Sequence, residues 1–436
     1  MLKKKGLVSL LLVAGPCALI HSNVDALHLK DALQRAPEAN FQILLAGEGV
    51  RSQEELTRAT RSALLPQVQL EAAQGRNMAP NIDPFSKSIP GIPKRFFVDR
   101  FDAVLRARLS LLNTRSIDDW RLSKLDLQAT ELRLQNTTQD ILRQIAIAYV
   151  THWRNEQKLA VIDKTLERDR ILKQIAVDQK DAGVATTLDV TRAEVALAGN
   201  ELIRLQQETM VLESALDLKR ALNFPLDKVF TVQVGDLVVE DQASQAQNLA
   251  DILETRADYQ KLLAELEHEE MAHKAAWREH LPSVELSGQW GYASEAWSDS
   301  MEEQWAVQLG VSVPVFEGFR IDAKKRASAS AVRGKEIELD ELKSQIDAEY
   351  RLVQQQFQSS HQQVRVARKA RDLNAREFEL ERIRFQEGVA DNSDVVDAQT
   401  RLADAEDTLV EAQYQLLLTW INRARVSGDV MSLVKN

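Results

Sequence analysis

The side chains best placed for chemistry are two aspartates close to the end of the chain. Asp394 and Asp397 are three positions apart in an expected helix, so their carboxylates project from nearly the same face. Such a pair attracts cations. Acidic residues in a first helical turn also suit the helix dipole, which requires no further function. Both interpretations are open on these residues alone.

The other candidate residues offer neither a catalytic nor a metal site. His268 and His273 are five positions apart, which does not place them on one helical face. The single cysteine, Cys17, lies in the N-terminal leader, so thiol catalysis and disulfides are excluded for the rest of the chain. We find no phosphate-binding loop, catalytic elbow or zinc motif. We therefore expect no enzymatic activity, no cofactor and no bound metal.

Composition favours long solvated helices. The chain has 436 residues, of which 28% are charged and only 6% are aromatic, which is unlike a packed α/β enzyme. The length suggests two domains or an internal duplication. The net charge of −10 argues against nucleic-acid binding, which requires a basic face.

The N-terminus predicts export. A basic start at residues 3–5 precedes an apolar stretch that is too short to span a bilayer, and a small-residue cleavage site follows. We interpret residues 1–26 as a signal peptide. Lipidation of Cys17 is an alternative, which is disfavoured because Pro16 stands where a small residue is expected.

The mature chain contains an internal duplication. The phrase "GVATTLDVTRAEVAL" that begins at Gly183 is echoed by "GVADNSDVVDAQTRL" from Gly388, and "LPQVQLEAAQG" is echoed by "LPSVELSGQWG". We predict a first repeat at 27–222, an equatorial segment at 223–255, a second repeat at 256–424 and a tail at 425–436.

Each repeat contains two segments in which apolar and polar residues alternate. In the second repeat Leu286, Trp290 and Tyr292 share one face, and glutamine, serine and glutamate share the other. The segments are about ten residues long, which is the length that a tilted strand needs to cross a bilayer. A half-buried sheet in a soluble protein would give the same pattern.

Two very long helices are predicted as well. The stretches at about 117–182 and 320–387 contain no proline and a single glycine, and a helix of this length measures about 100 Å. Val395, Leu402, Leu409 and Leu416 recur at heptad spacing, with alanines between them, which indicates a coiled-coil seam. Gly183 and Gly388 suit the ends of the long helices, so each repeat forms a helical hairpin.

These features together resemble the TolC-type outer-membrane efflux family. "SVPVFEGFRIDAKKRASASA" is similar to the family's strand exit, and "RFQEGVADNSDVVDAQTRLADAEDTLVEAQYQLLLTWINRARVSG" to its final hairpin. "LHLKDALQRAPEANFQILLAGEGV" resembles its first mature helix. Three departures stand out: the strand exit of the first repeat lacks the Pro and Gly of the second, a proline-containing insert separates the first two strands, and Ala257 stands where the family has proline.

The resemblance implies a mainly α fold with a small β part. Each chain would contribute two long antiparallel helical hairpins to a tunnel and four strands to a twelve-stranded barrel shared by a homotrimer. The protein would lie in the outer membrane, extend into the periplasm and receive substrates from a periplasmic adaptor and an inner-membrane transporter. Two alternatives stay open: the outer-membrane duct of a type I protein secretion system, and an exported coiled-coil scaffold.

The resemblance also assigns roles to residues. Asp394 and Asp397 would form carboxylate rings at the periplasmic aperture, and Asp189 would help to hold it closed. The family's gating arginine falls on Ala390 and its aromatic residue on Phe385, so the closing network must differ here, and Arg384 or Arg192 would substitute. The adaptor would meet the hairpin tips at Gly183, Val184, Gly388 and Val389. Leu286 would face lipid, with Trp290, Tyr292 and Trp305 in an aromatic belt, for which Trp297 is a further candidate.

Overall fold

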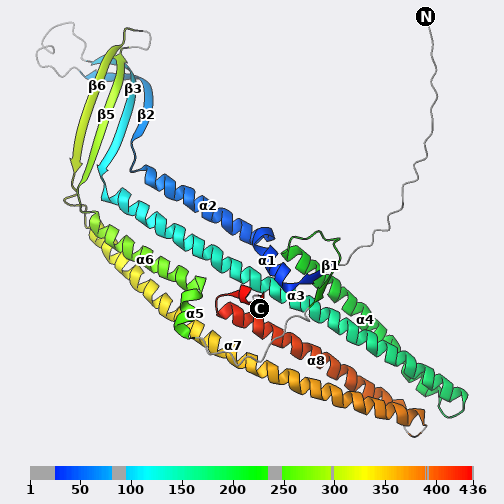
Figure 1. Cartoon of the computed structure of the whole chain (residues 1–436). Helices are drawn as coiled ribbons and strands as arrows, with labels where there is room; N and C mark the ends of the chain where they lie inside the picture. Colours follow the sequence, from blue (N-terminus) through cyan, green and yellow to red (C-terminus); the bar gives the residue numbers. More distant parts are fainter. Residues whose placement is uncertain are drawn as a thin grey trace, which may run out of the picture.

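The computed structural model describes residues 25–80, 95–233, 248–295, 299–387, 389 and 392–434. Most of the predicted signal peptide therefore lies outside the described residues, as do Trp297, Gly388 and Ala390. The molecule is elongated, with a sheet at one end and the turns of two helical hairpins at the other (Figure 1). Within the described residues, no helix combines the length and the apolar character needed to cross a membrane.

The first repeat runs from a short strand to a long helical hairpin. Its elements are β1 (Asp25–His28), α1 (Leu29–Ala39), α2 (Phe41–Ser62), β2 (Gln67–Pro80), β3 (Arg95–Leu112), α3 (Thr114–Asp181) and α4 (Thr187–Ala221). The predicted first helix is broken into α1 and α2. The break falls at Asn40, whose extended backbone lets its side chain accept a hydrogen bond from the Gln42 amide at 2.9 Å and cap α2.

The second repeat follows the same order. After β4 (Phe230–Gln233), its elements are α5 (Leu249–Thr255), α6 (Ala257–Arg278), β5 (Ser283–Ser294), β6 (Glu302–Ser312), α7 (Arg320–Gln386), α8 (Asn392–Val426) and the short 3-10 helix η2 (Val430–Val434). The long helices α3 and α7 have 68 and 67 residues and match the two that the sequence predicts. The predicted signal-peptide boundary after Ala26 falls inside β1.

The four long strands form one antiparallel sheet in the order β2-β3-β5-β6. The central β3–β5 pair joins the two repeats. In the first repeat the strands are longer than the predicted ten residues, with 14 residues in β2 and 18 in β3. The predicted loop insert between them is therefore partly strand, and residues 81–94 of it lie outside the described residues.

The helices lie side by side in one curved layer (Figure 1). Near the sheet the order is α2-α3-α6-α7, and toward the hairpin turns it is α4-α3-α8-α7. The helices α3 and α7 run through both halves. One edge of the layer therefore consists of α2 and α4, and the opposite edge consists of α7.

The largest apolar core lies at the middle of the molecule. There α1, α3, α4 and α8 pack around the small parallel sheet of β1 and β4. Tyr149 is fully buried in this core, and its hydroxyl donates to the Leu27 carbonyl at 2.7 Å. The β-like sequence of the predicted equatorial segment is accounted for by β4.

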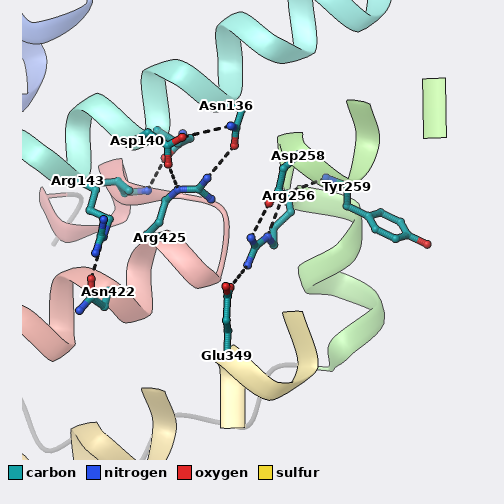
Figure 2. A network of polar contacts seen from close by, with 11 residues as sticks. Asn136, Asp140, Arg143, Arg256, Asp258, Tyr259, Glu349, Asn422 and Arg425 are labelled. Carbon is teal, nitrogen blue, oxygen red and sulfur yellow. Dashed lines mark hydrogen bonds and ion pairs between the residues drawn. The ribbon is translucent and has the colours of Figure 1, made fainter. Parts of the chain in front are cut away.

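A polar network reinforces the same level of the molecule (Figure 2). Arg425 of α8 donates to Asp140 of α3 at 2.8 Å, and the buried Arg256 donates to Asp258 at 2.6 Å and to Glu349 of α7 at 3.1 Å. Burial alone would raise the pKa of Asp258, but the hydrogen bonds and charge of Arg256 outweigh it and hold that pKa below its usual value. The middle of the molecule is therefore stabilised by charge-assisted hydrogen bonds as well as by apolar packing.

Candidate functional site

The sheet has one apolar face, built by the register of its strands. Leu70, Leu105, Trp290 and Trp305 pair in one row that crosses all four strands. A second apolar row on the same face, four residues along each strand, joins Leu109, Leu286 and Leu309. Trp305 is 71% exposed and Trp290 is 50% exposed, although both are large apolar side chains. A single chain therefore presents a broad apolar surface to its surroundings.

The opposite face of the sheet is polar. Arg106 contacts Glu71 at 2.5 Å, and Arg100 contacts Asp102 at 2.8 Å, so each of these charges has a partner within the sheet. The amide of Gln304 also donates to Asp102 at 3.1 Å. The two faces carry the alternation that the sequence predicts, although Glu303, which pairs with Tyr292, is a charged residue on the apolar side.

Two of the predicted aromatic-belt residues contact each other on the apolar face. The rings of Trp290 and Tyr292 meet edge to face, with centroids 5.8 Å apart. The indole N–H of Trp290 donates to Glu303 at 2.9 Å. The arrangement gives the indole a polar partner and leaves its ring exposed, which is typical of aromatic residues at a boundary between an apolar medium and water.

The turn of the first helical hairpin is fixed by Gly183. Its φ of +80° is left-handed, and the Val184 amide reaches back to the Gln179 carbonyl at 2.9 Å, which closes the end of α3. Val184 is 74% exposed at the extreme end of the molecule. The structure thus places the predicted contact residues Gly183 and Val184 at an accessible tip.

Asp189 has a structural partner at this tip. Its carboxylate accepts from the Thr186 amide at 2.8 Å and from the Thr186 hydroxyl at 2.6 Å, in a capping box that starts α4. The hydrogen bonds from Thr186 lower the pKa of Asp189. Arg192, one of the two arginines suggested for the closing network, lies 3.8 Å from Asp189 on the next turn.

The second tip carries the predicted aspartate pair. Asp394 and Asp397 are both exposed at the start of α8, whereas Val395, between them, and Ala398, which follows Asp397, are completely buried. The carboxylates therefore point away from the hairpin core on one side of α8. Val389 is exposed at the turn.

The two residues suggested for the closing network of this tip have partners within their own hairpin. Phe385 is buried in the small core formed with Phe378, Val395 and Leu402. Arg384 contacts Glu381 one turn earlier at 2.8 Å. The structure of one chain therefore does not bring Arg384 to the aspartate pair.

The two hairpins are joined near their tips by polar contacts that the sequence did not reveal. Gln179 of α3 donates to the Phe385 carbonyl of α7 at 2.7 Å. Asp169 of α3 is 4% exposed and accepts hydrogen bonds from Asn200 of α4, at 2.7 Å, and from Gln399 of α8. Burial raises the pKa of Asp169, although the hydrogen bonds from Asn200 and Gln399 oppose the shift. One buried carboxylate thus connects three helices.

Comparisons with known proteins agree with this architecture. A family model described as outer membrane efflux protein matches residues 248–428. The proteases secretion protein PrtF of Dickeya chrysanthemi is 22% identical over 95% of this chain and 90% of its own length. The probable efflux pump outer membrane protein TtgC of Pseudomonas putida is 22% identical over 92% of this chain and 82% of its own length. The chain therefore resembles the outer membrane efflux protein family, and the match to the family model lies in its second half.

A solved structure extends the agreement to the fold of both repeats. The outer-membrane channel OprN superimposes with a TM-score of 0.79 at 19% identity, over 92% of this chain and 89% of its own. The family model matches only the second repeat, whereas the similarity in fold covers the first repeat as well. The sheet and the two hairpins described above are accordingly shared with the fold of that channel.

Proposed function

We propose that this chain forms a passive exit duct in the outer membrane, as a homotrimer that receives substrates from a periplasmic adaptor and an inner-membrane transporter. Energy is supplied by the transporter, and the duct performs no chemistry. The family match and the similarity to TtgC and OprN support this role. The observation that carries the proposal is that one chain has two complementary edges in its sheet and two in its helical layer, so that one edge of a copy can pair with the opposite edge of the next.

The sheet provides the first pair of edges. Among the described strands, β2 and β6 each pair on one side only. The alternation of direction across β2-β3-β5-β6 makes β6 of one copy antiparallel to β2 of the next. An open edge is not tolerated in lipid, where every backbone N–H and C=O needs a partner. Pooling strands from several copies removes both edges, and three copies of four strands give a barrel of twelve.

The helical layer provides the second pair of edges. On the α4 edge, Leu188, Val195 and Leu202 are exposed at heptad spacing. On the α7 edge, Val366, Leu373 and Leu380 are exposed at the same spacing. Exposed heptad seams are typical of helices that pack against another helix. A contact between two different edges repeats head to tail and closes into a ring.

The two faces of the sheet determine which side of the ring contacts lipid and which side contacts water. The apolar rows that contain Leu286 and Trp305 face lipid in this arrangement, and the face that carries Arg106 and Gln304 lines water. The tips at Gly183, Val184, Gly388 and Val389 lie at the periplasmic end and meet the adaptor. The exposed carboxylates of Asp394 and Asp397 form rings at the narrow end of the tunnel, six acidic groups in three copies.

The acidic rings predict block by multivalent cations. In single-channel recordings with hexamminecobalt(III), the double change Asp394→Asn and Asp397→Asn is expected to raise the half-blocking concentration by about tenfold, which corresponds to ~1.4 kcal/mol. Asp404→Asn is the control, because Asp404 is also exposed on α8 but lies further from the tip. Equal effects of the double variant and the control would reject the aperture role.

A duct for protein secretion is the second candidate, favoured by the similarity to PrtF over almost the whole chain. The two ducts share a fold and differ in their substrates. A deletion strain separates them: an efflux duct predicts at least about fourfold greater sensitivity to several unrelated toxic compounds, whereas a secretion duct predicts loss of one exported protein from the medium. The fold shared with a channel argues against the third alternative, an exported coiled-coil scaffold.

A further inference from the structure

We propose that Glu201 on α4 of one copy forms ion pairs with Lys369 and Arg376 on α7 of the next copy, and that these charges fix the register in which two copies meet. The inference rests on the proposed homotrimeric duct and names the residues by which its copies recognise one another. Within one chain α4 and α7 lie on opposite edges of the helical layer, so these charges meet only between copies (Figure 1).

The two edges carry opposite charges that have no ion-pair partner within the described residues. Lys369 and Arg376 are exposed and seven positions apart, and each lies three residues after a member of the exposed apolar column on the α7 edge. Glu201 is exposed next to Leu202 of the apolar column on α4. Charges that border an apolar heptad column select the partner and the orientation of helices in a coiled coil.

The junction between the two hairpins inside one chain shows how such edges pack. There α3 lies beside α8, and Arg168 of α3 contacts Glu406 of α8 at 2.8 Å. The repeats are offset by the 205 residues that separate the glycines of the two turns, so the counterpart of Glu406 is Glu201 on α4. The counterpart of Arg168 is Leu373 on α7. In the proposed ring, α4 meets α7 of the next copy as α8 meets α3 within the chain.

The acid of this ion pair is therefore present on the α4 edge, and its cations lie one helical turn away on α7. Lys369 is four residues before Leu373 and Arg376 is three residues after it, so both are its neighbours on the helix surface. In the first repeat the counterpart of Arg376 is the apolar Ile171. The second cation is thus found only where α7 forms an edge of the layer.

A groove beside Glu201 offers room for these cations. It has a volume of about 590 Å³ and lies between α3 and α4. Its charged lining consists of Asp163, Glu167, Arg170, Glu201 and Arg204. Arg204 is already paired with Asp163 at 2.7 Å, which leaves two carboxylates and one guanidinium. The groove therefore carries an excess of negative charge, which complements the α7 edge.

The charges also determine which edges meet. Two α7 edges brought together would place Lys369 and Arg376 against the same cations, and two α4 edges would place Glu201 beside another carboxylate. Like charges at a contact disfavour both symmetric arrangements. The contact between different edges is the one that repeats head to tail and closes into a ring.

Charge reversal on each edge, separately and together, tests the contact in the full chain. Glu201→Lys sets a cation against two others, and the double change Lys369→Glu and Arg376→Glu sets carboxylates against Glu201. Each is expected to lower the yield of heat-modifiable oligomer in extracted outer membranes at least about fivefold, and the triple change to restore it to within about twofold. Glu213→Lys is the control, because Glu213 is exposed on α4 three heptads after Arg192, the counterpart of Asp397 on the tunnel side.

Cross-linking covers the case in which a reversed charge impairs folding. With Cys17→Ser as background, Glu201→Cys and Lys369→Cys are combined in one chain, and membranes are treated with a short bismaleimide. Because the two positions lie on opposite edges of the layer, the reagent joins them only between copies and should give covalent trimers. Glu213→Cys combined with Lys369→Cys should give monomers.

Rescue by the triple change and covalent trimers from the 201–369 pair are the expected results. Normal assembly of both reversals, or failure of the rescue, overturns the ion pairs and leaves the duct intact. Oligomers that form without covalent trimers also overturn them, because the two positions would then be out of reach of each other. An unmodified chain that forms no oligomer would instead contradict the proposed duct itself.

Discussion

Replacing Leu309 with arginine is expected to abolish assembly of the protein in the membrane. Leu309 lies at the β6 end of an apolar row with Leu109 and Leu286, and it is 62% exposed in one chain. An arginine on the lipid face at mid-membrane costs about 2–4 kcal/mol, and a trimer incurs that cost three times. The yield of heat-modifiable oligomer in extracted outer membranes should fall more than about tenfold.

The adjacent residue provides a matched control. Gln308 lies on the polar face, in register with Ser287, so Gln308→Arg adds the same charge to the same strand on the side that we assign to water. This variant should assemble at close to the normal yield. A comparable loss from both variants would mean that the two faces of the sheet do not have the environments proposed here.

A second large effect is expected at the junction between the repeats. A Cβ added at Gly291 would lie 2.1 Å from the Ala103 carbonyl oxygen and 2.6 Å from the Val104 Cα, which is closer than any ordinary contact. Both atoms belong to the backbone of β3, so relief requires β3 and β5 to separate. We expect Gly291→Ala to destabilise the fold by about 3 kcal/mol, at the upper end of the cost of overpacking.

Gly288 in the same strand is the control for this prediction. The nearest atom to a Cβ at Gly288 would be the Ala306 carbonyl oxygen at 3.9 Å, which is an ordinary contact. Urea unfolding of the detergent-solubilised protein, followed by circular dichroism, should show a lower midpoint for Gly291→Ala and a nearly unchanged one for Gly288→Ala. Equal midpoints for the two variants would refute the close approach of β3 and β5.

The hairpins could be predicted from the sequence because their signals are local. A helix can end at a glycine in the left-handed conformation, and the next helix can start at a threonine cap. Both signals depend only on neighbouring residues in the chain, and Gly183 and Thr186 follow these rules. The strand faces were predicted for the same reason, since alternation is written in consecutive residues.

The strand lengths were not predicted, because pairing extends them beyond the apolar pattern. In β2 and β3 the alternation of apolar residues fades toward the loop, and proline and polar residues there are typical of turns. Arg76 and Asp99 nevertheless face each other across the pair, with contacts of 2.6 and 2.8 Å. A cross-strand ion pair of this kind becomes visible only when both strands are in place.

The contacts between hairpins were missed for a related reason. Aspartate, asparagine and glutamine on a long helix normally indicate a solvated face, so Asp169, Asn200 and Gln399 carried no signal. Their contact joins residues 230 positions apart, between α3 and α8. The assignment of Asp394 and Asp397 to an aperture came from a family resemblance, and their outward direction on α8 is compatible with it.

The pairing of β3 with β5 also determines how quickly a closed ring can be built. Because the two repeats occupy one polypeptide, half of the junctions between repeats form at a fixed local concentration that does not fall on dilution. The proposed ring of three chains then requires two encounters between separate molecules before it closes, whereas six unlinked halves would require five. Duplication followed by fusion thereby makes assembly less sensitive to how little protein reaches the membrane.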